Sequence, residues 1–143
     1  MSNQDMELNS GLAAFEAKRF GEAWQLLKPA AEAGNAQAQH RLAIMCQNGL
    51  GMVKNDLMAY RWMHAAAEQG YALAQHGVGF MYLVGECVEK NETEALKWFQ
   101  RAAEQGLSGS MMTLGMMYEQ GLGTACDEAE AKRWHERASK SDA

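Results

Sequence analysis

Histidine is the residue type in this chain best suited to metal binding or acid–base chemistry, and there are four: His40, His64, His76 and His135. None of them belongs to an H-E-x-x-H motif, to a C-x-x-C pair or to a spacing that would gather metal ligands on one helix face. No Ser-His-Asp, Cys-His or paired-carboxylate arrangement is visible either. The sequence therefore predicts no catalytic residue, no metal and no cofactor, and we expect a protein that is not an enzyme.

Two Gly-Leu-Gly segments, residues 49–51 and 121–123, have the start of a phosphate-binding loop. They lack the preceding strand, the third glycine and the Lys-Ser/Thr pair that such loops require, so we expect ordinary turns.

The three cysteines, Cys46, Cys87 and Cys126, fall at different phases of the repeat described below. Structural disulfides in a repeat protein would recur at one phase, so this set indicates free thiols in a reducing cytoplasm. By its position in the repeat Cys46 is expected in the core, and Cys87, in a loop, is expected to be the exposed thiol.

The chain repeats itself every 36 residues. Trp62, Trp98 and Trp134 keep that step, and segments 35–70 and 71–106 are identical at fifteen of 36 positions. Unrelated segments of ordinary composition would share about two or three. A fixed period of this size indicates stacked supersecondary units, with the tryptophans as core residues.

Each period contains two amphipathic helices, here called helix A and helix B. In helix A, small and apolar residues such as Ala38, Leu42 and Met45 fall at helical spacing on one face. Glycines able to take the left-handed conformation follow helix A, and N-cap residues precede helix B. These glycines are Gly49, Gly85 and Gly121, and the caps are Asn55, Asn91 and Asp127.

Residues 5–34 form a variant first unit with a shorter loop, in which Pro29 is expected to kink helix B or shift its start. Together with segments 35–70, 71–106 and 107–143, this gives four helix pairs in a single repeat domain over residues 1–143.

The pattern A-x-x-x-[LV]-[AG]-x-x-[YC]-x-x-G-x-G, followed by [ND]-x-x-x-A-x-x-W-x-x-x-A-A-E-x-G, resembles the Sel1-like repeat, a relative of the tetratricopeptide repeat. The resemblance covers residues 35–143, although Ser139 and Lys140 replace the Ala and Glu of the pattern. Residues 5–34 are more similar to a tetratricopeptide unit. This resemblance implies an all-α fold, a right-handed superhelix of antiparallel helix pairs that binds other proteins without catalysis.

The informative surface consists of helix A positions that point away from helix B. One row of these positions is apolar and consists of Leu12, Ile44, Phe80 and Met116. A contiguous apolar strip on a repeat protein marks an interaction site, unless the protein's own residues fill it. We expect it to hold a peptide or helix of a partner protein, with Phe80 as anchor and with His40 and His76 hydrogen-bonding the partner. The partner-binding residues expected are Leu12, Phe15, His40, Ile44, Gln47, His76, Phe80, Leu83, Met112, Met116 and Glu119.

The amino-acid composition argues against nucleic acids and membranes as partners. Thirteen Lys and Arg against 18 Asp and Glu give a net charge of −5, without the basic patch that nucleic acid binding needs. No run of residues approaches a membrane-spanning length, so no membrane insertion is expected. We expect a cytoplasmic adaptor, a monomer or weak oligomer. The alternative is an immunity or inhibitory protein that caps a toxin or enzyme.

Overall fold

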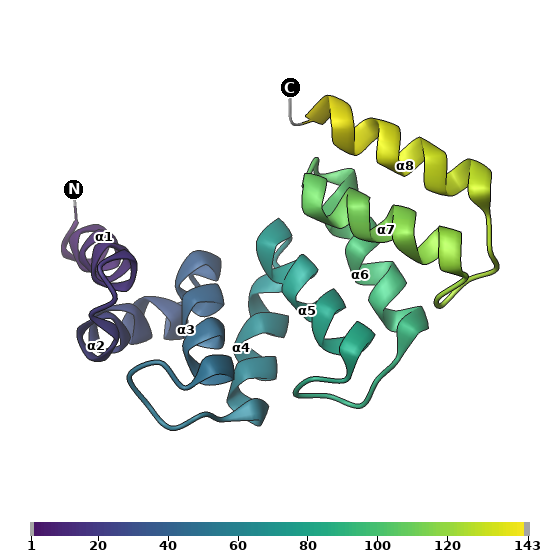
Figure 1. The fold of residues 1–143 in the computed structure, drawn as a ribbon. Coiled ribbons are helices and arrows are strands. Elements are labelled where there is room, and N and C mark those ends of the chain that lie inside the picture. The colour runs from purple at the N-terminus through teal and green to yellow at the C-terminus, as the bar shows by residue number, and fades with distance from the viewer. Residues whose placement is uncertain (1, 142–143) are drawn as a thin grey trace. The chain divides into compact units, whose positions relative to one another are not determined.

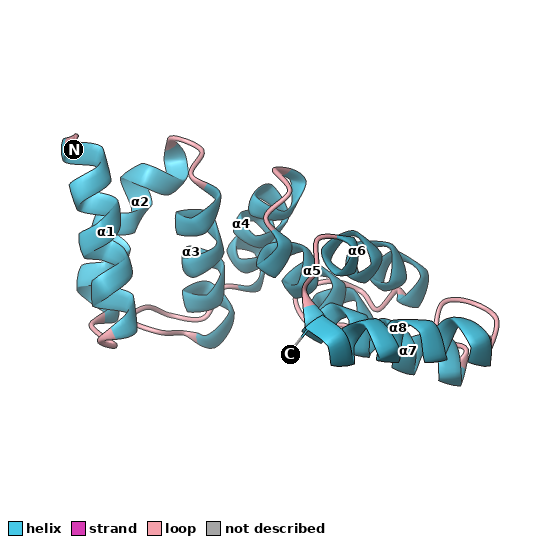
Figure 2. Ribbon diagram, turned by 90° about the horizontal axis from the view of Figure 1, so that it is seen from above, coloured by secondary structure: helices cyan, strands magenta, loops and turns pink. Residues whose placement is uncertain are grey.

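Residues 2–141 are described by a computed structural model, and they form eight α-helices joined by short loops (Figure 1). Figure 2 shows helices and loops, and no strand, in this part of the chain. The helices are α1 (Asn3–Glu16), α2 (Phe20–Glu32), α3 (Ala36–Asn48), α4 (Asp56–Glu68), α5 (Ala72–Val84), α6 (Glu92–Glu104), α7 (Ser108–Gln120) and α8 (Glu128–Ser141). The all-α class and the four predicted helix pairs are confirmed.

The chain divides into two compact units, Met1–Tyr71 with α1 to α4 and Ala72–Ala143 with α5 to α8. We refer to them as unit 1 and unit 2. Each has its own buried core, centred on Leu27, Leu42 and Met45 in unit 1 and on Phe99 and Leu114 in unit 2. That residues 1–143 form a single repeat domain stays a prediction.

The helix ends follow the predicted capping residues. The side chains of Asn55, Asn91 and Asp127 each accept a hydrogen bond from the backbone N–H three residues further on, at 3.0 Å. This satisfies one of the N–H groups that the first turn of helix B leaves without an intrahelical partner. Helix A ends where Gly49 and Gly121 take the left-handed conformation, with φ of 67° and 68°.

Within each unit, a buried glutamine of helix A forms side-chain hydrogen bonds to neighbouring helices. In unit 1 the Gln39 amide donates to the carbonyl of Ala31 at the end of α2, and it accepts from Gln69 at 2.9 Å. In unit 2 Gln105 donates in the same way to Gln75, at 2.8 Å. These bonds satisfy side chains that would be costly to bury unpaired, so they fix how helix A lies against its neighbours.

Two of the three repeat tryptophans are core residues, as predicted. Trp98 and Trp134 are buried, and the guanidinium carbons of Arg101 and Arg137 lie 4.5 Å from the ring centroids. Trp62 is only partly buried and packs at the edge of the unit 1 core. Trp62 therefore packs on the core as well, but it is less buried than Trp98 and Trp134.

Two local predictions were also tested. Helix α2 runs through Pro29 from Phe20 to Glu32, so Pro29 does not set its start. All three cysteines are free, and Cys46 is buried as expected. Cys126 is the exposed thiol, whereas Cys87 is partly buried, which corrects the expectation for Cys87.

Candidate protein-interaction surface

The predicted partner-binding residues divide between the two units, and each set lies on the helix A members of its own unit. Unit 1 contributes Leu12 and Phe15 from α1 and His40, Ile44 and Gln47 from α3; unit 2 contributes His76, Phe80 and Leu83 from α5 and Met112, Met116 and Glu119 from α7.

In unit 1, most of the predicted residues are engaged in the packing of the unit itself. Leu12 and Phe15 pack against the core, and the Phe15 ring contacts the edge of Phe20 with 5.6 Å between centroids. The Arg41 guanidinium lies 5.5 Å from the Phe15 centroid. Leu12 and Phe15 therefore keep only part of their surface free for a partner.

His40 is 9% exposed and already has its own partners. Arg41 Nη1 donates to His40 Nδ1 at 2.8 Å, because a guanidinium can only donate, and the imidazole lies 5.4 Å from the Tyr71 ring. Burial, and then the Arg41 charge, lower the pKa of His40 to about 4. His40 is therefore neutral at physiological pH.

In unit 2, His76 joins α5 to α7. Its Nδ1 lies 2.8 Å from the hydroxyl of the fully buried Ser110, and its ring contacts the edge of Phe99 with 5.0 Å between centroids. Burial lowers the pKa of His76 below its usual value. Both imidazoles therefore have pKa values below that of a free histidine side chain.

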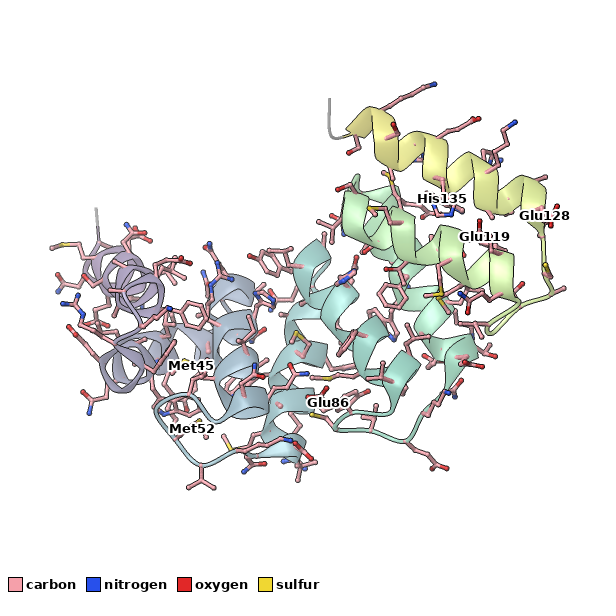
Figure 3. The ribbon with its side chains drawn as sticks, viewed as in Figure 1. Met45, Met52, Glu86, Glu119, Glu128 and His135 are labelled. Atoms are coloured by element: carbon pink, nitrogen blue, oxygen red, sulfur yellow. The ribbon has the colours of Figure 1, made fainter. Side chains whose placement is uncertain are left out.

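Among the predicted partner-binding residues, two apolar side chains of unit 2 stay open to solvent. Phe80 is 43% exposed and Met112 is 55% exposed, while Leu83 and Met116 pack partly against the core beside them. Glu119 lies in the last turn of α7, with its carboxylate 3.7 Å from His135 Nε2 of α8. Figure 3 shows Glu119 and His135 facing one another between these helices.

Two residues of α5 belong with this surface and were not predicted. Leu73 is 43% exposed and Val84 is 51% exposed. With Phe80 they stand at i, i+7 and i+11, which places all three on one side of the helix. The signal was present in the sequence, because α5 contains no charged residue and its outward positions are apolar. We call Leu73, His76, Phe80, Leu83, Val84, Met112, Met116 and Glu119 the unit 2 face.

Residues 2–141 contain no group of three or more His, Cys, Asp or Glu side chains able to hold a metal ion. No helix among them is long and apolar enough to cross a membrane.

The family comparison covers most of the chain. The Sel1 repeat model matches residues 19–35, 36–71, 72–107 and 108–142. The last three matches agree with the predicted segments to within one residue. The first covers only α2 of the variant unit, so α1 lies outside the match. No curated protein sequence matches the chain significantly.

Solved structures share the fold. A Sel1 repeat protein from Oxalobacter formigenes is 34% identical with a TM-score of 0.89, over 94% of this chain and 55% of that one. The protective antigen c5321 of uropathogenic Escherichia coli, which displays an SLR fold, is 36% identical with a TM-score of 0.80, over 81% and 25% of the chains. Cysteine rich protein B of Helicobacter pylori has a TM-score of 0.67 at 19% identity, over 85% and 87%. The chain thus spans about half of the first of these structures and a quarter of the second. By its four repeat matches, the chain belongs to the Sel1 repeat family.

Proposed function

We propose that this chain is a non-catalytic adaptor that binds a helix or an apolar peptide of a partner protein on the unit 2 face. Sel1 repeat proteins are generally protein-interaction modules, which supports the class of function. The observation that carries the proposal is the exposure of Phe80 and Met112, together with that of Leu73 and Val84, on helices that carry almost no charge.

The physical argument is the free energy of removing these side chains from water. Fully burying a large apolar side chain contributes about 1.5–3 kcal/mol, and Phe80 and Met112 each have about half of their surface left to bury. Aromatic residues at the centre of an interface are typical hot spots, and methionine adapts its shape to the partner. Phe80 is therefore the proposed anchor.

We assign unit 1 a smaller part in binding. Leu12, Phe15 and His40 are held by contacts within unit 1, so a partner would gain little by covering them. Ile44 and Gln47 remain the proposed contacts there. We further propose that the protein works in the cytoplasm, which the three free cysteines support. We also propose that it is a monomer or weak oligomer.

The test is capture of the partner by the tagged chain, followed by titration calorimetry with the purified partner. Phe80→Glu is expected to weaken binding by about 2 kcal/mol or more, as at a central hot spot. The matched control is Leu57→Glu, because Leu57 is 60% exposed but lies on helix B of unit 1. Both variants should keep the helical circular dichroism of the native chain. If the partner binds Phe80→Glu as tightly as the native chain but no longer binds Leu57→Glu, the proposed site is overturned.

A further inference from the structure

The unit 2 face carries a single formal charge. The 13 residues of α5 contain no Asp, Glu, Lys or Arg, and the 13 residues of α7 contain only Glu119. The side chain of Glu119 is 56% exposed. A segment that crosses from Phe80 over Met116 therefore meets apolar groups first and a carboxylate at the far edge of α7.

The surroundings of Glu119 contain more acidic than basic side chains. Its ion-pair partner within residues 2–141 is His135, at 3.7 Å, and this pair is ionic only when the imidazole is protonated. The shallow hollow beside it, of about 540 Å³, is lined by three carboxylates, one lysine and this histidine; the lining residues are Glu119, Glu128, Lys132, His135, Glu136 and Ser139. The edge of the face is thus electronegative, and the end of helix α7 adds the negative pole of its dipole.

We propose that the partner segment carries a Lys or Arg next to its apolar anchor, and that this residue pairs with Glu119. The inference rests on the proposed function, because it names the chemistry of the partner for the same face. Charge complementarity of this kind adds modest affinity at an exposed site, but it selects among partners and fixes the direction in which they bind.

Two synthetic helical peptides test the idea without knowledge of the natural partner. Both carry the same Leu and Phe face, and one is flanked at each end by lysines, the other by glutamates. Binding to the full chain is followed by fluorescence anisotropy at 0.15 M salt, where charges more than about 8 Å apart are largely screened. We expect the lysine peptide to bind about two- to five-fold more tightly than the glutamate peptide.

Substitutions then assign the preference to one residue. Glu119→Gln should bring the affinity ratio of the two peptides close to one, and Glu119→Lys should reverse it. Glu104→Gln is the matched control for the net charge, because Glu104 is an exposed carboxylate on α6, away from the unit 2 face. It should leave the ratio unchanged.

The outcomes separate this inference from the proposed function. Suppose that Phe80→Glu abolishes binding of both peptides, but that Glu119→Gln leaves their affinity ratio unchanged. The unit 2 face then stands, and the proposed basic residue of the partner is overturned. If neither peptide responds to Phe80→Glu, the proposed face itself is overturned. If sedimentation shows that the native chain dimerises through Phe80, the unit 2 face instead binds a second copy of this chain.

Discussion

The buried ring of Phe99 lies directly against the backbone of Gly79. A Cβ atom on Gly79 would stand 3.1 Å from three atoms of that ring, which is closer than ordinary van der Waals contact. The equivalent pair in the last repeat is Gly115 and His135, where the Cβ position is 2.6 Å from Nε2. Helix A and helix B of unit 2 therefore approach each other through a glycine covered by a ring.

Gly79→Ala is expected to destabilise unit 2 although alanine favours helix by about 1 kcal/mol over glycine. Phe99 is buried, and overpacking a core costs about 1–3 kcal/mol. Gly115→Ala should cost less, because His135 is 41% exposed and can turn toward solvent. Urea unfolding midpoints measure both variants, and equal midpoints would contradict this account of the packing.

The stability of unit 1 should fall as the pH is lowered from 6.5 to 4. In the folded state the pKa of His40 is about 4, so the unfolded chain binds a proton in this range that the folded chain does not. At roughly 1.4 kcal/mol per pKa unit, the contribution is about 3 kcal/mol, fully present above pH 6.5 and lost as the pH approaches 4. Protonation would also cost the bond from Arg41 to Nδ1.

His40→Gln is the test of this pH dependence, because glutamine keeps an acceptor for Arg41 but does not titrate. Urea unfolding at half-unit pH steps should show a flatter profile for His40→Gln than for the native chain. The control is His64→Gln, at a partly exposed histidine of α4. Parallel profiles for the native chain and His40→Gln would show that His40 is not the group responsible.

The repeat pattern predicted the helices well because caps, glycines and apolar spacing are local signals. Asn55, Asn91 and Asp127 act within three residues of their own positions, so no tertiary knowledge was needed. The partial exposure of Trp62 goes with a local difference in sequence that the shared repeat pattern does not record. Arg101 and Arg137 cover Trp98 and Trp134 from three residues away, whereas the residue three places after Trp62 is Ala65.

The sequence predicted which positions of the candidate surface point outward, but it did not predict how exposed their side chains are. Helical spacing placed Phe15 and Phe80 in neighbouring rows of outward positions, yet Phe15 packs against Phe20 and Arg41 while Phe80 stays open. The difference depends on a first unit with a shorter loop and on the single arginine of α3. Neither follows from the period alone, because both depend on which side chains the neighbouring helices bring close.

Cys87→Gly is expected to stabilise unit 2 by about 1 kcal/mol. Cys87 has φ of 69°, a left-handed conformation that costs roughly 1–2 kcal/mol for a residue with a Cβ atom. Its counterparts in the other repeats, Gly51 and Gly123, have φ of 72° and 73°. Cys126→Ser, at the exposed thiol, is the control and should leave the urea midpoint unchanged. A lower midpoint for Cys87→Gly would mean that packing of the thiol outweighs the backbone strain.

The surface formed by α8 and the end of α7 should self-associate if it is given the residues with which α5 and α6 pack in the core of unit 2. Leu83, Leu96 and Phe99 pack in the core of unit 2 together with Ala103. Their counterparts 36 residues later are polar: Glu119, Lys132, His135 and Ser139. We infer that these polar residues disfavour self-association through this surface, because burying polar and charged groups without partners costs free energy.

The variant that tests this combines Glu119→Leu, Lys132→Leu, His135→Phe and Ser139→Ala. It would expose a contiguous apolar patch of several hundred Å², which is the size that marks association surfaces. Its sedimentation mass should rise with concentration above the 15.8 kDa of one chain. A control that exchanges the same positions for uncharged polar residues should behave like the native chain, since it exposes no apolar patch. If the apolar variant also sediments as a single chain at millimolar concentration, the polarity of this face is not what limits its self-association.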